Sequence, residues 1–131
     1  MGITGQLAEF CAYIGLAALP PEVVTRARFL VLALVGNIVR ARHDAESTAS
    51  FVASVRSLGM AAGNSGVFGD AARYNPVGAA FLNGALAHSL DFDDTHAAGS
   101  LHPGAPVIPA ALAAGEIAGA SGADVLAAII A

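Results

Sequence analysis

The residues that could do chemistry gather in one short stretch, AHSLDFDDTHAAGSLHPGAP, at residues 87–106. It holds three histidines and three aspartates, whereas the whole chain has only four histidines and ten acidic residues. Histidine exchanges protons near neutral pH, and a nearby aspartate can orient it or tune its basicity. The stretch is therefore the first candidate for an acid–base site.

Two other interpretations of the same stretch stay open. Clustered carboxylates suit Mg²⁺ or Ca²⁺, and added histidines suit zinc, but the spacing matches neither an EF-hand loop nor a helical His-x-x-x-His pair. Aspartate and threonine also cap helices and fix turns without any catalytic role. We expect neither a metal nor another cofactor here.

The segment HPGAPV, which begins at His102, adds an anion-binding feature. It predicts a helix that starts directly after the histidine. The free N–H groups at a helix start attract carboxylates. The pattern therefore favours a carboxylate-bearing substrate, held at the helix start with histidine and aspartate beside it.

Helices at regular intervals are predicted to position these residues. Apolar residues recur at helical spacing, Pro21 and Pro76 suit first helical turns, and Ser121 with Asp124 forms a predicted capping box. A short extended piece is expected at Val67–Phe68. The fold class is all-α, with about six helices at residues 3–18, 21–41, 46–58, 76–89, 105–119 and 122–131.

Three details of these helices carry expectations. The second helix, residues 21–41, is apolar nearly all round, so we expect it to be central. Asn83 and Gly84 stand inside the fourth helix although both disfavour helix interiors, which indicates close helix packing or a gap that faces the substrate. His88, at the end of that helix, is expected to be structural rather than catalytic.

The composition excludes several classes of protein. Of 131 residues, 56% are hydrophobic and only 12% charged, against about 25% charged in an average domain. No apolar run reaches the roughly 20 suitable residues of a membrane span. The six arginines stand singly and lysine is absent, which argues against a nucleic-acid partner. The N-terminus lacks a basic secretory segment and Cys11 is the only cysteine, so we expect a cytoplasmic protein.

So apolar a chain is expected to leave helix faces that need a partner. A homo-oligomer is one solution, and the remainder of a longer polypeptide is another. The last predicted helix reaches Ala131 without a cap, which favours a truncated chain.

The sequence resembles the MmgE/PrpD family, which includes 2-methylcitrate dehydratase, cis-aconitate decarboxylase and iminodisuccinate epimerase. The resemblance rests on the motifs NG, AHSLDFDDTH, HPG and PAALAAGE, and it covers nearly the whole chain. It implies that residues 1–131 are the N-terminal segment of the family's large helical domain. The α+β lid domain that closes the family's active site is absent from this sequence.

The resemblance also implies roles for single residues. Asp91 and His102 would be catalytic and would position or protonate the substrate, while Thr95 would hydrogen-bond a substrate carboxylate. His96 in the loop and Gly104 at the helix start complete the predicted substrate-binding set. Further family residues, including a lysine and a histidine, lie beyond residue 131.

The implied activity is that of a metal-independent lyase acting on a di- or tricarboxylate, most like the hydro-lyase 2-methylcitrate dehydratase. Decarboxylation or epimerisation on the same scaffold is the first alternative. A truncated, non-catalytic helical interaction or dimerisation module is an alternative of another class. We expect the 131-residue chain by itself to be inactive, because it holds only part of the acid–base set.

Overall fold

The computed structural model describes residues 2–131 and confirms the all-α class. Within that range the strands form one short antiparallel pair, in which Ser65 lies opposite Tyr74. The elements in chain order are α1 (Ile3–Tyr13), the 3-10 helix η1 (Leu16–Ala18), α2 (Pro21–Asp44), α3 (Thr48–Ser57), β1 (Ser65–Gly66), β2 (Arg73–Tyr74), α4 (Pro76–His88), the 3-10 helix η2 (Ala97–Gly99), α5 (Gly104–Ala118) and α6 (Gly122–Ile130).

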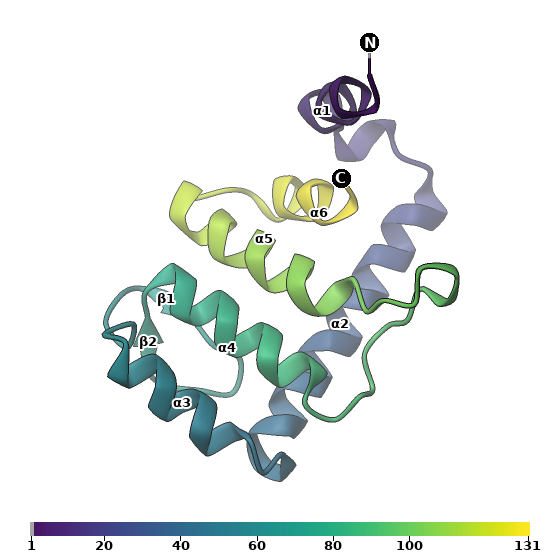
Figure 1. Ribbon diagram of the computed structural model, residues 1–131. Helices are drawn as coiled ribbons and strands as arrows, with labels where there is room; N and C mark the ends of the chain where they lie inside the picture. Colours follow the sequence, from purple (N-terminus) through teal and green to yellow (C-terminus); the bar gives the residue numbers. More distant parts are fainter. Residues whose placement is uncertain (1) are drawn as a thin grey trace.

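The fourth helix, α4, is the centre of the fold. It lies alongside α5 and also packs against α2 and α3 (Figure 1). Six of its 13 residues are buried, including Leu82 and Leu86, which are fully shielded from solvent. Such burial stabilises the folded state by roughly 1.5–3 kcal/mol for each leucine. The core therefore forms around the helix that leads directly into the histidine- and aspartate-rich stretch.

The expectation that residues 21–41 form the central helix is wrong. Helix α2 buries only Ala27, Leu34, Ile38 and Ala41. Phe29 and Leu32 stay 61% and 68% exposed on its outer face. An all-round apolar pattern shows that a helix can be buried on every side, but the packing decides how many sides receive a neighbour.

The contact between α4 and α5 reaches the backbone itself. A Cβ on Gly84 would lie 2.9 Å from the Ala105 carbonyl oxygen, so only glycine allows this approach. Pro109 lies inside α5 and has no N–H to donate to the carbonyl four residues earlier, which is that of Ala105. The carbonyl that Pro109 leaves without its helical partner is thus the one that Gly84 approaches. Close helix packing explains Gly84.

Asn83 ties the segment before β2 to α4. Its Oδ1 accepts a hydrogen bond from the Phe68 N–H at 3.0 Å, and its Nδ2 donates to the Gly66 carbonyl at 3.0 Å. The predicted extended piece is displaced: the strands lie at Ser65–Gly66 and Arg73–Tyr74, and residues 67–70 form the turn between them. The reason is Gly69, whose φ of +75° reverses the chain directly after Phe68.

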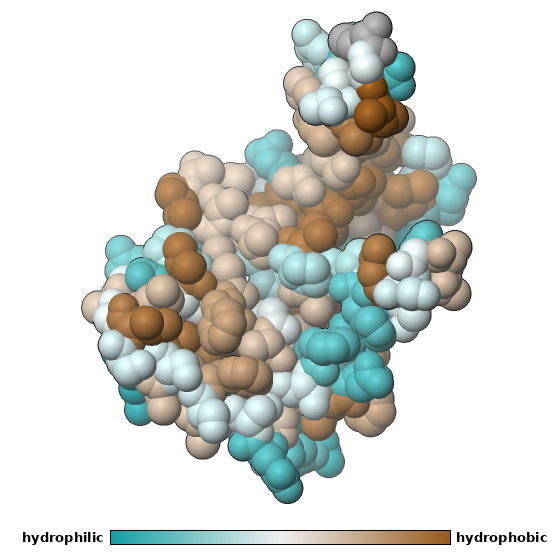
Figure 2. Space-filling view, viewed as in Figure 1, coloured by the Kyte–Doolittle hydropathy of each residue, from teal (hydrophilic) through white to brown (hydrophobic). Residues whose placement is uncertain are grey.

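The N-terminal helix is shorter than predicted. Instead of reaching residue 18, α1 ends at Tyr13, because Ile14 and Gly15 adopt extended backbone before η1 begins. No residue of α1 is buried, and its side chains Ile3, Leu7, Phe10 and Tyr13 lie exposed. Figure 2 shows hydrophobic, brown surface on this helix. The expected homo-oligomer stays a prediction. Among residues 2–131, no helix combines the length and the apolar character needed to cross a membrane.

Tyr74 is the largest fully buried side chain, and it contacts the partly buried carboxylate of Asp70. Its hydroxyl donates to Asp70 Oδ2 at 2.7 Å, the Ala72 N–H donates to Asp70 Oδ1, and Arg42 Nη1 lies 3.1 Å from Asp70 Oδ2. Burial opposes ionisation of Asp70, but these three partners outweigh it and lower the pKa of the carboxyl. The pKa of the Tyr74 hydroxyl is raised, mainly by burial and further by its hydrogen bond to the Asp70 carboxylate.

The lowered pKa predicts an acid-sensitive contribution to stability. Because the folded-state pKa of Asp70 lies below its unfolded value, the group stabilises the fold above the unfolded pKa of about 3.9 and loses that effect as the pH falls through the folded pKa. Asp70→Asn should therefore flatten the acid decline in the free energy of unfolding, measured by urea titration at several pH values. Glu9→Gln, on the exposed helix α1, is the control; a variant at Asp70 with the full wild-type decline would contradict the prediction.

Two glycines inside helices should respond oppositely to alanine. Gly84→Ala should destabilise the protein by about 1–3 kcal/mol, because the new Cβ strikes the Ala105 backbone. Gly36→Ala, in α2, places its Cβ where no other atom lies within 4 Å, and it should stabilise the protein by about 0.5–1 kcal/mol through helix propensity. Thermal unfolding followed by circular dichroism measures both, and equal effects would show that the helix contact is not the cause.

Candidate active site

The antiparallel packing of α4 on α5 brings the end of one helix beside the start of the other. His88 is the last residue of α4, and His102 stands two residues before α5. Their rings meet edge to face, with centroids 4.9 Å apart and an angle of 64° between the planes. The loop between the helices, residues 89–103, closes over this point and carries all three aspartates of the motif.

Asp93 is the buried residue that lies next to both histidines. Its side chain is only 1% exposed, and both of its carboxylate oxygens lie 3.0 Å from His88 Nδ1. His102 Nδ1 lies 3.5 Å from Asp93 Oδ2, beyond a good hydrogen bond. A carboxylate accepts hydrogen bonds and does not donate them, so the tautomer that suits this contact carries its hydrogen on His88 Nδ1 and leaves Nε2 without one.

Asp91 takes a different position from Asp93. Its backbone is left-handed, with φ of +54°, and its N–H donates to the His88 carbonyl, so the chain turns sharply at the end of α4. The side chain is 81% exposed, and its Oδ1 lies 4.0 Å from His102 Nε2. The two residues predicted to be catalytic, Asp91 and His102, thus face each other across the loop.

Asp94 binds the start of α5. Its Oδ2 accepts a hydrogen bond from the Gly104 N–H at 3.3 Å, and a Cβ on Gly104 would collide with the same carboxylate. Pro106 has no N–H, and the Val107 N–H donates to the Pro103 carbonyl. The helix start that the sequence offers to a substrate is therefore already engaged by the chain's own carboxylate, and the predicted role of Gly104 in substrate binding stays a prediction.

Thr95 and His96 begin a separate small turn. The His96 N–H donates to the Leu101 carbonyl at 2.8 Å, and His96 Nδ1 accepts from the Gly99 N–H at 2.9 Å. Both Thr95 and His96 are exposed. The structure brings neither into the cluster of His88, Asp91, Asp93 and His102, and their predicted substrate contacts remain untested predictions.

The two histidines line a hollow of about 640 Å³ between α4 and α5. The other lining residues are small or apolar, with Phe81 the largest, and none of the described lining residues carries a guanidinium or ammonium group. Gly84 lines the same hollow, and the alternative interpretation of the NG motif, a gap that faces the substrate, stays a prediction. An apolar wall with two imidazoles at one end can hold a small organic acid beside proton-transfer groups.

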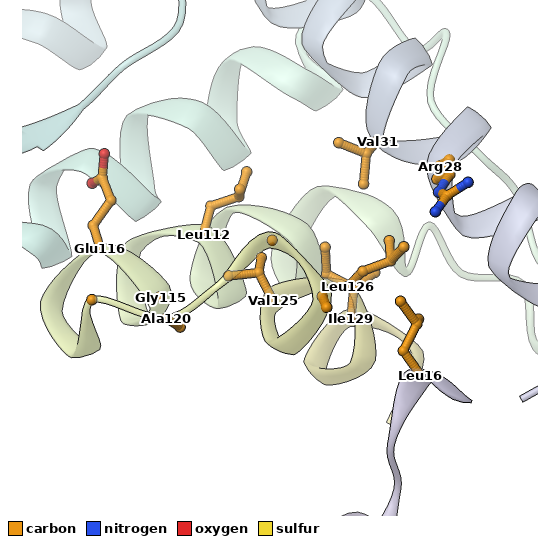
Figure 3. Close-up of a pocket in the computed structure, with 13 residues that line it drawn as sticks. Leu16, Arg28, Val31, Leu112, Gly115, Glu116, Ala120, Val125, Leu126 and Ile129 are labelled. Carbon is orange, nitrogen blue, oxygen red and sulfur yellow. The ribbon is translucent and has the colours of Figure 1, made fainter. Parts of the chain in front are cut away.

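A larger groove of about 710 Å³ lies elsewhere, between α2, α5 and α6. Figure 3 shows aliphatic side chains along it, with Arg28 and Glu116 at opposite ends. It contains neither histidine nor paired carboxylates among its described lining residues, so it lacks the groups for acid–base chemistry.

Sequence reasoning misses two residues of the cluster. It predicts a structural role for His88, and it does not distinguish Asp93 from the neighbouring aspartates. The only signal for the pair is the five-residue spacing from His88 to Asp93 across a helix end. That spacing becomes a contact only because Asp91 takes left-handed backbone between them.

Comparison with known proteins shows the family of this chain. Residues 5–131 match the model of the MmgE/PrpD N-terminal domain. The chain belongs to the MmgE/PrpD family. A cis-aconitate decarboxylase-like protein, oryM, of Aspergillus oryzae is 30% identical over 120 residues, and cis-aconitate decarboxylase of Aspergillus terreus is 29% identical over 122. Each alignment covers 88% of this chain but only 23% of the relative. No solved structure matches the chain significantly.

The family motif HPG predicts a sharp penalty for any side chain at its glycine. Gly104→Ala should push Asp94 away from the start of α5 and shift the loop that carries Asp93, because the Cβ and the carboxylate cannot share the space. Histidine ring signals in two-dimensional NMR should then move for His88 and His102. Gly122→Ala, at the start of α6 with nothing within 4 Å, is the control and should leave both signals in place.

Proposed function

We propose that this chain is the N-terminal part of a lyase that acts on a small di- or tricarboxylate, and that dehydration of a 2-methylcitrate-like substrate is its reaction. One observation carries the proposal: His88 and His102 line one hollow, and each has an aspartate beside it, Asp93 at His88 and Asp91 at His102. Family membership supports the class of enzyme.

The two pairs suit the two proton transfers of an elimination. A base removes the proton from the carbon next to a carboxylate, and an acid protonates the hydroxyl on the neighbouring carbon, which leaves as water while the double bond forms. His88, with its Nδ1–H held by Asp93, presents Nε2 as the base. His102, beside Asp91, is placed to carry the proton for the leaving group.

Decarboxylation is the second candidate, and the names of the Aspergillus relatives favour it. In that reaction the bond between carbon and carboxylate breaks, carbon dioxide leaves with its oxygens, and an acid delivers a proton to the carbon. The same histidines serve as the proton source. The two reactions need different carbons of the substrate to lie over His102. The groups that orient the substrate decide which carbon lies there.

The site in this chain lacks groups that neutralise a multiply charged substrate. No described lining residue of the hollow carries a permanent positive charge, and the sequence has no lysine. A tricarboxylate needs fixed positive groups to bind and to hold the charge that develops during reaction. We therefore propose that residues outside this chain complete the site.

We predict weak, localised binding without turnover by the 131-residue chain. Addition of 2-methylcitrate or cis-aconitate should shift amide NMR signals of residues 88–105, and His102→Gln should abolish the shifts, whereas His43→Gln at the exposed end of α2 should not. Proton NMR of the same samples should show no product. Shifts elsewhere, or product formation by this chain alone, would contradict the proposal.

The reaction is then assigned in a polypeptide of the relatives' length with residues 1–131 at its N-terminus. Proton NMR in D₂O separates the three outcomes. Dehydration gives an alkene from 2-methylcitrate, decarboxylation gives a five-carbon product from cis-aconitate, and epimerisation exchanges the α-proton for deuterium without other change.

A further inference from the structure

We propose that His88, Asp91, Asp93 and His102 form a binding site for a divalent metal ion of the zinc class, and that the ion switches the acid–base site off. The metal binding stands on the geometry alone. Only its inhibitory consequence rests on the proposed function.

The ligand atoms already lie at the spacing of a metal site. One nitrogen or oxygen from each of the four residues lies within 4.8 Å of all the others. Tetrahedral zinc with bonds of about 2.0–2.1 Å holds its ligand atoms roughly 3.4 Å apart. The observed separations are 3.0 Å from His88 Nδ1 to Asp93 and 3.5 Å from His102 Nδ1 to Asp93.

The unpaired ring nitrogen of His102 is a second observation that favours a metal ion at this cluster. His102 Nδ1 is shielded from solvent and has no hydrogen-bond partner among the described residues, although the buried Asp93 carboxylate lies 3.5 Å away. A polar atom that is shielded from water and has no partner destabilises the fold. An ion between His102, His88 and Asp93 would satisfy this nitrogen and the carboxylate together.

The set of ligands selects the class of metal. Two imidazole nitrogens with carboxylate oxygens suit zinc, cobalt and nickel, whereas magnesium and calcium prefer six or more oxygens. Asp93 supplies the buried carboxylate, and Asp91, exposed above His102, needs the largest movement to become the fourth ligand. Its exposed side chain has the freedom to make that movement.

Metal binding and proton transfer exclude each other at this site. The ion replaces the proton on His88 Nδ1, which is released to solvent, and no group is oxidised or reduced. Once the ion holds both imidazoles and the carboxylate, neither histidine–aspartate pair can pass a proton to a substrate. A zinc-class ion is therefore expected to inhibit an enzyme built on this cluster.

The test uses Co²⁺ as a visible probe on the chelator-treated 131-residue chain, followed by Zn²⁺ competition in a calorimeter. We expect one equivalent of Co²⁺ with visible absorption bands that Zn²⁺ removes. His88→Gln and His102→Gln should each weaken Zn²⁺ binding by at least about 100-fold, since even the loss of a supporting residue around a metal costs 10–100-fold. His96→Gln, in the same loop, and His43→Gln should bind as the wild type does.

Unchanged Zn²⁺ affinity in His88→Gln and His102→Gln, or a loss in His96→Gln, would overturn the metal site. Circular dichroism checks that each variant is folded. A measurement on the unaltered chain covers the case of a misfolded variant: Zn²⁺ should shift the ring-nitrogen NMR signals of His88 and His102 and leave those of His43 and His96 in place. Signals that do not move at His88 and His102 also overturn it. Because these assays use the metal alone, their failure leaves the carboxylate-binding test of the lyase proposal untouched.

Discussion

The close approach of α4 and α5 sets the relative position of the two helices that position the histidines. Gly84 has no Cβ, and Pro109 leaves the Ala105 carbonyl without its helical donor, so the two backbones meet at a distance that other residues would prevent. The contact sits near the end of α4 and the start of α5. It therefore fixes how far apart His88 and His102 lie, although neither histidine takes part in it.

The three aspartates of the DFDDT motif do three different things within four residues. Asp91 turns the chain with left-handed backbone and keeps its carboxylate exposed beside His102. Asp93 is buried and binds His88, and Asp94 binds the first N–H of α5. A single mutation in this motif should therefore alter the turn, the contact with His88 or the start of α5, depending on which aspartate is changed.

The surface of the molecule also bears on how the site works. Membership of the MmgE/PrpD family is established over residues 5–131, while the alignments cover 23% of each fungal relative. Apolar residues on α1 and α2 are exposed. The hollow beside the histidines has no permanently charged cation among its described lining residues. The surface is therefore rich in apolar groups and poor in cations. Under the proposed function, this chain would supply acid–base groups, and the groups that neutralise a polycarboxylate, which are not among the described lining residues of the hollow, would come from elsewhere.

Local signals in the sequence predicted the helical class, most helix positions and the stretch in which histidines and aspartates meet. Helical spacing of apolar residues, prolines in first turns and the Ser121–Asp124 capping box are local signals, and the structure confirms that box with both of its hydrogen bonds. Motif resemblance led to the family and to Asp91 and His102. Local patterns could not show that α4 rather than α2 is central, because burial depends on which neighbours arrive. They also could not show that the buried Asp93 contacts His88, or that Asp94 accepts a hydrogen bond from the Gly104 N–H at the start of α5. Those contacts join residues across a turn and between two helices, so only the tertiary packing decided them.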